Sequence, residues 1–168
     1  MSLTLAAEVA IALNFGIFAL AAVWYVAPWL GTQRRADALT PLVWVHVFRD
    51  IALQIFSAQH FGFLVSVPAR DMIAYGDVAG TILALISLVA LRYHARIAVL
   101  FVWILVLESV VDLLHAMAAG LQEQLFEKAS GVTWLILTFY VPVLWVTLGL
   151  IVWQLYVRRN ESLALVRA

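Results

Sequence analysis

Ionisable side chains lie inside two long apolar segments of this chain. The second segment carries His46, Arg49 and Asp50, and the fourth carries Glu108 and Asp112. A charged side chain at the centre of a membrane-spanning helix costs about 2.5–3.5 kcal/mol on insertion scales. These groups must therefore face one another, a polar cavity or another subunit rather than lipid. Such residues are functional by default, so they form the candidate site.

Helical spacing arranges these residues in two stripes. At about 100° per residue, one arc of the second segment holds most of its polar residues: His46, Arg49, Asp50, Ser57 and His60, with Gln54 at the edge. Gln59 points elsewhere. In the fourth segment, the spacing i, i+4, i+7 places three residues on one stripe: Glu108, Asp112 and His115. The two segments run parallel in an alternating bundle. Counting from their cytoplasmic ends, we expect Arg49, Asp50 and Glu108 to meet near mid-membrane, with His60 and His115 in the outer half.

The third and fifth segments add polar groups that can face the same space. Asp77 lies between Gly76 and Gly80, small residues that let helices approach closely. Tyr140 and Thr147 share one stripe of the fifth segment. The predicted ligand-binding residues are Arg49, Asp50, Gln54, Asp77, Tyr140 and Thr147. The predicted catalytic residues are Glu108, Asp112, His115 and His46.

Three chemistries fit these residue types. Glu108 or Asp112 could exchange a proton with a lipid-soluble substrate, with histidine as partner. Asp112 and His115, spaced i, i+3, together with His60, could hold a metal ion such as Zn, Fe or Mn. His60 and His115 could also be the axial ligands of one b-type haem. The sequence favours neither a metal ion nor haem, so the cofactor stays open.

The composition is typical of an integral membrane protein. Hydrophobic residues make up 65% of the 168 residues, with a mean hydropathy of +1.02, whereas soluble domains are nearer half apolar. The lipid bilayer is thus the first expected partner, and a small apolar or lipid-like molecule is the second. The net charge is zero, which argues against a nucleic-acid partner. The absence of cysteine excludes disulfides and thiolate metal sites within this chain.

Five segments have the roughly 20 apolar residues that a spanning helix needs. They cover approximately residues 3–30, 39–67, 72–91, 97–119 and 132–157. Proline and glycine mark most of their ends, and Pro142 inside the fifth predicts a kink. The runs are long and do not alternate as barrel strands would. The predicted fold is all-α, a single transmembrane domain of residues 1–168 that forms a five-helix bundle.

Basic residues predict the orientation of this bundle. One side would hold seven of them: Arg34, Arg35, Arg92, Arg96, Arg158, Arg159 and Arg167. The other side would hold only Arg70 and Lys128. Because the side rich in arginine faces the cytoplasm, we expect the N-terminus outside and the C-terminus in the cytoplasm.

Short motifs add a resemblance. The chain contains, in order, His46-Val-Phe-Arg49, Tyr75-Gly76-Asp77, Asp112-Leu113-Leu114, Tyr140-Val141-Pro142 and Leu144-Trp145-Val146-Thr147. Over most of its length it resembles a group of small bacterial integral membrane proteins with several spans. The resemblance implies a multi-pass protein of the bacterial inner membrane and implies no activity. It makes His46, Arg49, Asp77 and Asp112 the first positions to test.

Three functions remain open from the sequence. The first is a membrane-embedded site between the second and fourth spans that binds or converts a small apolar ligand. The second is a proton-linked transporter or channel subunit that uses the same residues as a relay; with five spans, such a carrier would be a homo-oligomer. The third is a structural or assembly subunit of a membrane complex.

Overall fold

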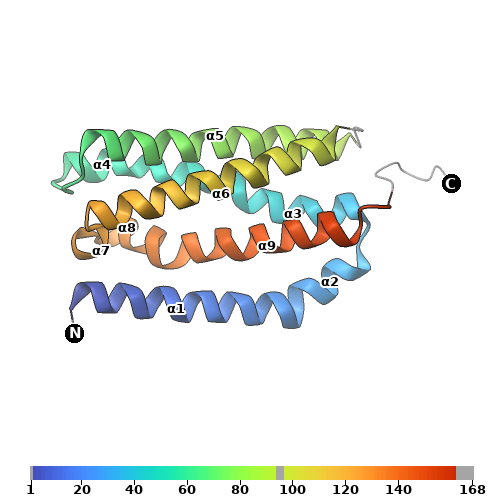
Figure 1. The fold of residues 1–168 in the computed structure, drawn as a ribbon, viewed down its shortest axis with the longest axis horizontal. Coiled ribbons are helices and arrows are strands. Elements are labelled where there is room, and N and C mark those ends of the chain that lie inside the picture. The colour runs from blue at the N-terminus through green and yellow to red at the C-terminus, as the bar shows by residue number, and fades with distance from the viewer. Residues whose placement is uncertain (1, 94–96, 162–168) are drawn as a thin grey trace.

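The computed structural model describes residues 2–93 and 97–161, and within these ranges the chain is helical and contains no strand. Five helices there are long and apolar enough to cross a membrane: Leu3–Thr32, Arg35–His60, Val67–Arg92, Ala98–Gln122 and Gly131–Val157. The prediction of an all-α bundle with five such helices is confirmed (Figure 1). This architecture is compatible with a multi-pass membrane protein.

Several of the long helices are built from consecutive pieces. The first comprises α1 (Leu3–Ala21), η1 (Ala22–Val26) and α2 (Ala27–Thr32), and the second comprises α3 (Arg35–Val47), η2 (Phe48–Leu53) and α4 (Gln54–His60). Helices α5 (Val67–Arg92) and α6 (Ala98–Gln122) are continuous. After the short α7 (Leu125–Lys128), the fifth long helix comprises α8 (Gly131–Leu135), η3 (Ile136–Tyr140) and α9 (Val141–Val157). The segments η1 and η3 are π-helical, and η2 is a 3₁₀ helix.

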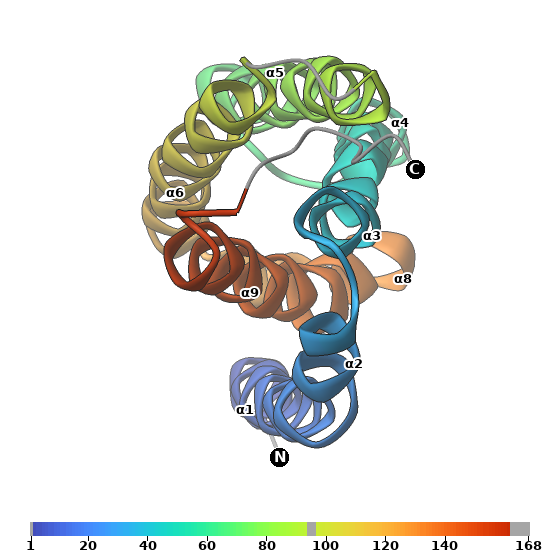
Figure 2. The same cartoon turned by 90° about the vertical axis from the view of Figure 1, so that its right-hand side faces the viewer.

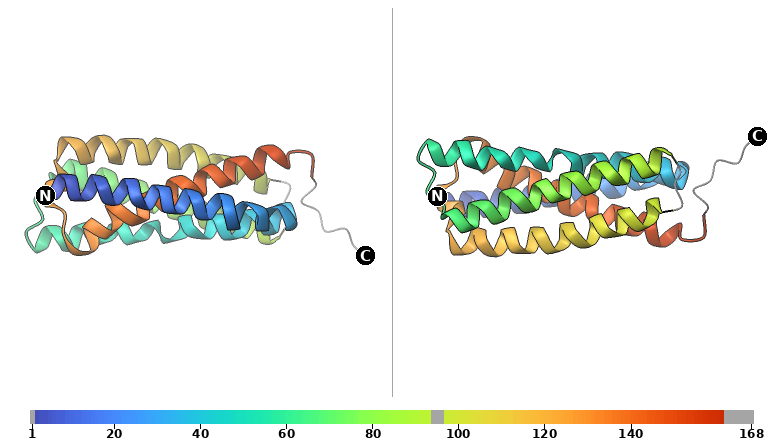
Figure 3. Two further views of the ribbon diagram at one scale, coloured as in Figure 1. Left: turned by 90° about the horizontal axis from the view of Figure 1, so that it is seen from below. Right: turned by 90° about the horizontal axis from the view of Figure 1, so that it is seen from above.

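Four of the long helices form a ring and the first stands outside it. Helix α5 packs on α6 and on α3, while α9 packs on α3, on α6 and on α1. Figure 2 shows this ring end-on, with α1 beside α9. Successive long helices alternate in direction, so the described ends of the chain lie at opposite ends of the bundle (Figures 1 and 3). The second and fourth long helices therefore run parallel, as their stripes require.

The second long helix ends at His60, whereas the hydropathy pattern predicts a span over residues 39–67. The intervening residues are apolar but leave the helix, because Gly62 adopts a positive φ of 96°. Ser66 then begins α5, its Oγ accepting from the backbone N–H of Ala69 at 3.4 Å. The Ser66 hydroxyl also donates to Glu123, and this hydrogen bond lowers the pKa of the Glu123 carboxyl.

The 3₁₀ segment η2 changes which face of the second long helix is buried. At three residues per turn, its six residues rotate the chain by about 120° more than an α-helix would. Buried positions accordingly recur at every third residue: His46, Arg49, Ala52 and Ile55. Asp50, Ser57 and His60 are exposed. The arc predicted from ideal α-helical spacing therefore does not hold along this helix.

The two π-helical segments each precede a proline. Proline lacks an N–H and clashes with the carbonyl four residues earlier, so the regular ladder fails there. For Pro142 that carbonyl belongs to Thr138 in η3, and the Asn14 amide of α1 donates to it at 2.8 Å. The disturbance predicted at Pro142 is thus a π-helical turn, and it supplies a polar bond that holds α1 to the ring.

The apolar core falls into two parts along the bundle. The larger cluster includes Val43, Leu88, Val102 and Leu148, among others, and fills one half. The smaller cluster lies toward the other end: Ile55, Val65, Ala74 and Leu125. In the second and third long helices, Arg49 and Asp77 fall between the two clusters in sequence. These charged groups therefore interrupt a core that is otherwise apolar.

Candidate functional site

Arg49 is the centre of the polar site. Its side chain is fully buried and comes from η2. Its Nε donates to Oδ1 of Asp77 on α5 at 2.8 Å. Its Nη1 donates to Oε2 of Glu108 at 3.1 Å and to Oγ of Ser109 at 2.9 Å, both on α6. Its Nη2 forms an ion pair with Oδ2 of Asp112 one turn further along. One guanidinium thus joins three helices of the ring.

The site holds three carboxylates against one guanidinium. Four of the five N–H donors of Arg49 are engaged by protein groups. Each carboxylate contacts Arg49 through only one of its oxygens. Burying a charge is tolerable only when it is paired and hydrogen-bonded, so Arg49 acts as the internal counter-ion of this cluster. The carboxylates keep spare acceptor capacity, whereas the guanidinium is nearly saturated.

Two glycines of α5 make room for this cluster. A Cβ atom on Gly80 would overlap the Arg49 guanidinium, and one on Gly76 would overlap the Asp112 carboxylate. The spacing i, i+4 puts both glycines on one face of α5, toward η2 and α6. The small residues around Asp77 are therefore required by the two charged side chains that lie against them.

His46 forms a second polar contact, between α3 and α9. Its Nε2 lies 3.2 Å from Oγ1 of Thr147, and its ring is fully buried. The Thr147 hydroxyl also lies within hydrogen-bonding distance of the Val143 carbonyl, at 2.8 Å, and of the Leu144 carbonyl, at 3.1 Å. Which partner receives its single proton depends on the tautomer of the His46 ring. Nδ1 of His46 has no hydrogen-bond partner among the described residues.

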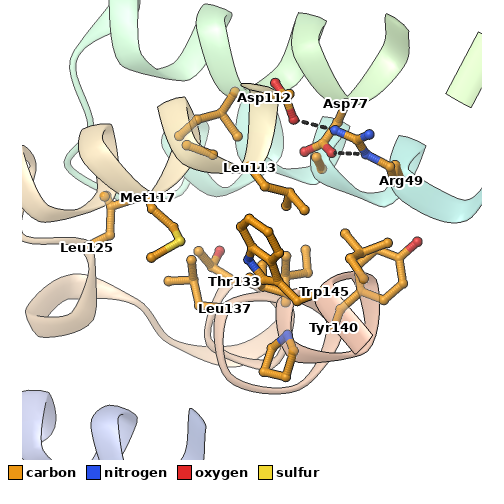
Figure 4. Close-up of a pocket in the computed structure, with 18 of the residues that line it drawn as sticks. Arg49, Asp77, Asp112, Leu113, Met117, Leu125, Thr133, Leu137, Tyr140 and Trp145 are labelled. Carbon is orange, nitrogen blue, oxygen red and sulfur yellow. Dashed lines mark hydrogen bonds and ion pairs between the residues drawn. The ribbon is translucent and has the colours of Figure 1, made fainter. Parts of the chain in front are cut away.

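A cavity of about 440 Å³ lies beside the Arg49 cluster. Most of its walls are apolar, from α1, α6, η3 and α9. The polar residues that line it are Arg49, Asp77, Asp112, Gln54, Thr133 and Tyr140. Figure 4 shows Trp145 and Tyr140 on the wall opposite Asp77 and Asp112. A mainly apolar cavity with a few convergent polar groups is the usual form of a small-molecule site, and its volume lies within the typical range of roughly 300–1,000 Å³.

The predicted site residues separate into three groups in the structure. Four of the predicted ligand-binding residues line the cavity: Arg49, Gln54, Asp77 and Tyr140. Asp112, a predicted catalytic residue, lines it as well. Glu108 bonds to Arg49 without lining the cavity, and His46 and Thr147 contact each other beside it. Asp50, His60 and His115 are exposed and make none of these contacts.

The residues considered for a metal ion or haem are not gathered. Across residues 2–93 and 97–161, no three His, Asp or Glu side chains are grouped so that they could hold a metal ion. The set His60, Asp112 and His115 therefore does not form a ligand shell. His60 and His115, considered as haem ligands, are both exposed and neither lines the cavity. The described part of the chain thus holds no grouped metal ligands, and haem binding by His60 and His115 stays a prediction.

Three residues of the site lie outside the sequence prediction. Ser109 is fully buried and binds Arg49, and its place beside Glu108 on α6 was the only signal for this role. Thr133 accepts from Nε2 of Gln54 at 3.0 Å and lines the cavity. Trp145 also lines it, although interfacial anchoring is the commoner role of tryptophan in membrane proteins.

The sequence of this chain matches one protein-family model. A family model described as "Domain of unknown function (DUF8737)" matches residues 6–156. The matched range contains the whole Arg49 cluster, the His46–Thr147 pair and the lining of the cavity. No curated protein and no solved structure matches the chain.

Proposed function

This chain belongs to the DUF8737 family, and we propose that it is a multi-pass membrane protein that binds a small apolar ligand in the cavity beside Arg49. The cavity itself supports this proposal most directly. Its apolar walls suit an apolar body, and the carboxylates of Asp77 and Asp112 provide polar contacts at one place on the wall. A purely structural ion pair would not need an adjoining space of about 440 Å³.

The ionic cluster gives the proposed site its chemistry. Asp112 is the cavity-lining member of the predicted catalytic residues, so it is the group that would exchange a proton with a bound molecule. Arg49 holds Asp112 and Asp77 in place from the protein side. Binding is the function we propose; conversion of the ligand would use these same carboxylates.

The proposal includes the orientation and place of the bundle. Arg34, Arg35, Arg158 and Arg159 flank one end, where the second long helix begins and the fifth ends. Arg96 and Arg167, which also entered the count, lie outside the described residues. By the positive-inside rule this end faces the cytoplasm, so the N-terminus is outside. The resemblance to small bacterial membrane proteins supports the bacterial inner membrane as the location.

Quenching of Trp145 tests ligand binding. We expect terminally brominated dodecanol, added to the protein in lipid nanodiscs, to quench tryptophan fluorescence with a saturable component. Trp145→Phe should remove that component, because Trp145 is the tryptophan that lines the cavity. Quenching by probe dissolved in lipid rises without saturation and so is separated from binding.

A pair of alanines on α6 provides the matched control. Ala116 lines the cavity, whereas Ala118 is exposed and does not line it. We expect Ala116→Phe to fill the space and abolish saturable quenching, while Ala118→Phe leaves it unchanged. Saturable quenching that survives Ala116→Phe, or none in the unmodified protein, would refute the proposed function.

A further inference from the structure

The charge balance at the cavity wall indicates which class of ligand fits it. We propose that the cavity accepts a single-chain amphiphile whose polar end is a protonated amine, bound by Asp77 and Asp112 with its chain against the apolar walls. The inference rests on the proposed function and specifies the ligand chemistry of that same site.

Hydrogen-bond capacity favours a donor over an acceptor. Arg49 bonds to one oxygen of each carboxylate. The other oxygens, Oδ2 of Asp77 and Oδ1 of Asp112, accept no hydrogen bond from any described residue, and Oδ1 of Asp112 packs against Gly76 of α5. Arg49 has one N–H left. An anionic head would meet two carboxylates and a nearly saturated guanidinium. An ammonium head donates three hydrogen bonds and meets acceptors that carry the opposite charge.

The wall facing the carboxylates also suits a cation. Trp145 and Tyr140 lie there, opposite Asp77 and Asp112 (Figure 4). The hydroxyl of Tyr140 is already committed to the Val45 carbonyl at 2.7 Å, so its ring rather than its oxygen is presented to the cavity. Aromatic faces attract cations, and most strongly so in desolvated sites.

The shape of the cavity favours an apolar chain that arrives from the lipid. Phe15 of α1 and Leu114 and Met117 of α6 line it, and each is also 44–52% exposed. These side chains lie on helices that have no substantial packing contact with each other, since α1 packs on α9, η3 and α7. The cavity therefore opens sideways between α1 and α6, toward the acyl chains of a surrounding bilayer.

A series of three probes with equal chains tests the inference. Terminally brominated dodecylamine, dodecanol and dodecanoate are titrated into the protein in nanodiscs of uncharged lipid, with saturable quenching of Trp145 as the readout. Because a hydrogen bond to a charged group contributes about 1.5–3 kcal/mol, we expect the amine to bind at least about tenfold more tightly than the alcohol. Dodecanoate should bind more weakly than the alcohol.

The variant Asp77→Asn keeps the shape of the side chain and removes one charge. We expect it to reduce the preference for the amine over the alcohol, because one of the two negative charges beside the ammonium head is removed. Asp37→Asn, which makes the same change at an exposed carboxylate outside the cavity, is the matched control and should leave that preference unchanged.

The outcomes separate this inference from the proposed function. Equal affinity for amine and alcohol, or a preference for dodecanoate, would overturn the amine inference and leave apolar ligand binding intact. An amine preference that Asp77→Asn does not reduce would also overturn it. No saturable quenching by any of the three probes would overturn both proposals.

Discussion

Arg49 is the residue on which the polar site depends. It is fully buried, and its partners come from both α5 and α6. Removing one partner of a buried ion pair is strongly destabilising, because an uncompensated charge is left behind. Here three carboxylates share one cation, so anything that displaces Arg49 leaves all of them without a counter-ion. The glycines that admit Arg49 are therefore as important to the site as its charged residues.

Gly80→Ala tests this dependence. The added Cβ would overlap the guanidinium, so Arg49 must move away from its carboxylates. We expect a loss of about 3 kcal/mol or more in the free energy of unfolding, measured by denaturant titration in detergent micelles.

Gly149→Ala on α9 is the matched control, because nothing lies within 4 Å of its added Cβ. Alanine favours helix over glycine by about 1 kcal/mol, so this variant should be neutral or stabilising. Equal losses in the two variants would mean that the contact between Gly80 and Arg49 is unimportant.

Part of the site follows from counting residues. Arg49 and Glu108 lie at equal depth on parallel helices, and the structure joins them at 3.1 Å. That prediction needed only the rise of a helix and the alternation of spans. The cavity did not follow, because its volume depends on how α1 stands away from α6. The sequence did not predict the bond between Ser109 and Arg49 either. A serine in an apolar helix carries no charge, and its place next to Glu108 does not show which residue it will bond to.

At the scale of helices, irregular turns decide which residues meet. The 3₁₀ segment η2 removes Asp50 and His60 from the buried face, and ideal α-helical spacing cannot anticipate this rotation. The π-helical turn η3 has a visible cause in the sequence, Pro142. Its consequence, the bond from Asn14 to the Thr138 carbonyl, required knowing that α1 packs on η3. The local sequence therefore predicts where a helix becomes irregular, but it does not predict which residue of another helix bonds to the irregular turn.

A double-mutant cycle tests the bond between α1 and η3. Asn14→Ala should reduce the free energy of unfolding by about 0.6 kcal/mol, the average for polar bonds between membrane helices. In a Pro142→Ala background the same change should cost less, because an alanine at that position has a backbone N–H that could donate to the Thr138 carbonyl. Additive effects of the two changes would contradict this account of the bond.

At the scale of the molecule, hydrogen bonds from arginine side chains to backbone carbonyls connect the helices at one end of the bundle. Arg158 donates to the carbonyls of Leu30 and Gly31 at 2.9 and 2.8 Å, which closes the end of α2. Arg35 donates to the carbonyl of Glu161 at 3.0 Å. Two of the arginines on which the proposed orientation rests thus also bond to backbone carbonyls, and those bound by Arg158 lie at the end of α2. The orientation is therefore best tested on residues that take no part in these bonds.

Because the chain contains no cysteine, single cysteines report orientation directly. Ser2→Cys and Asn160→Cys lie at exposed positions near opposite ends of the described chain. In intact bacterial cells stripped of the outer membrane, an impermeant maleimide should label Ser2→Cys and not Asn160→Cys. Labelling of Asn160→Cys alone would reverse the proposed orientation.

The most direct test of the central claim is to count ligands bound per chain. Native mass spectrometry of the protein released from nanodiscs equilibrated with dodecylamine gives that count without any optical probe. We predict one saturable adduct per chain in the unmodified protein and in Ala118→Phe, and none in Ala116→Phe, whose added ring would fill the cavity beside Arg49. An adduct of equal occupancy in Ala116→Phe, or the absence of a saturable adduct in the unmodified protein, would contradict the account.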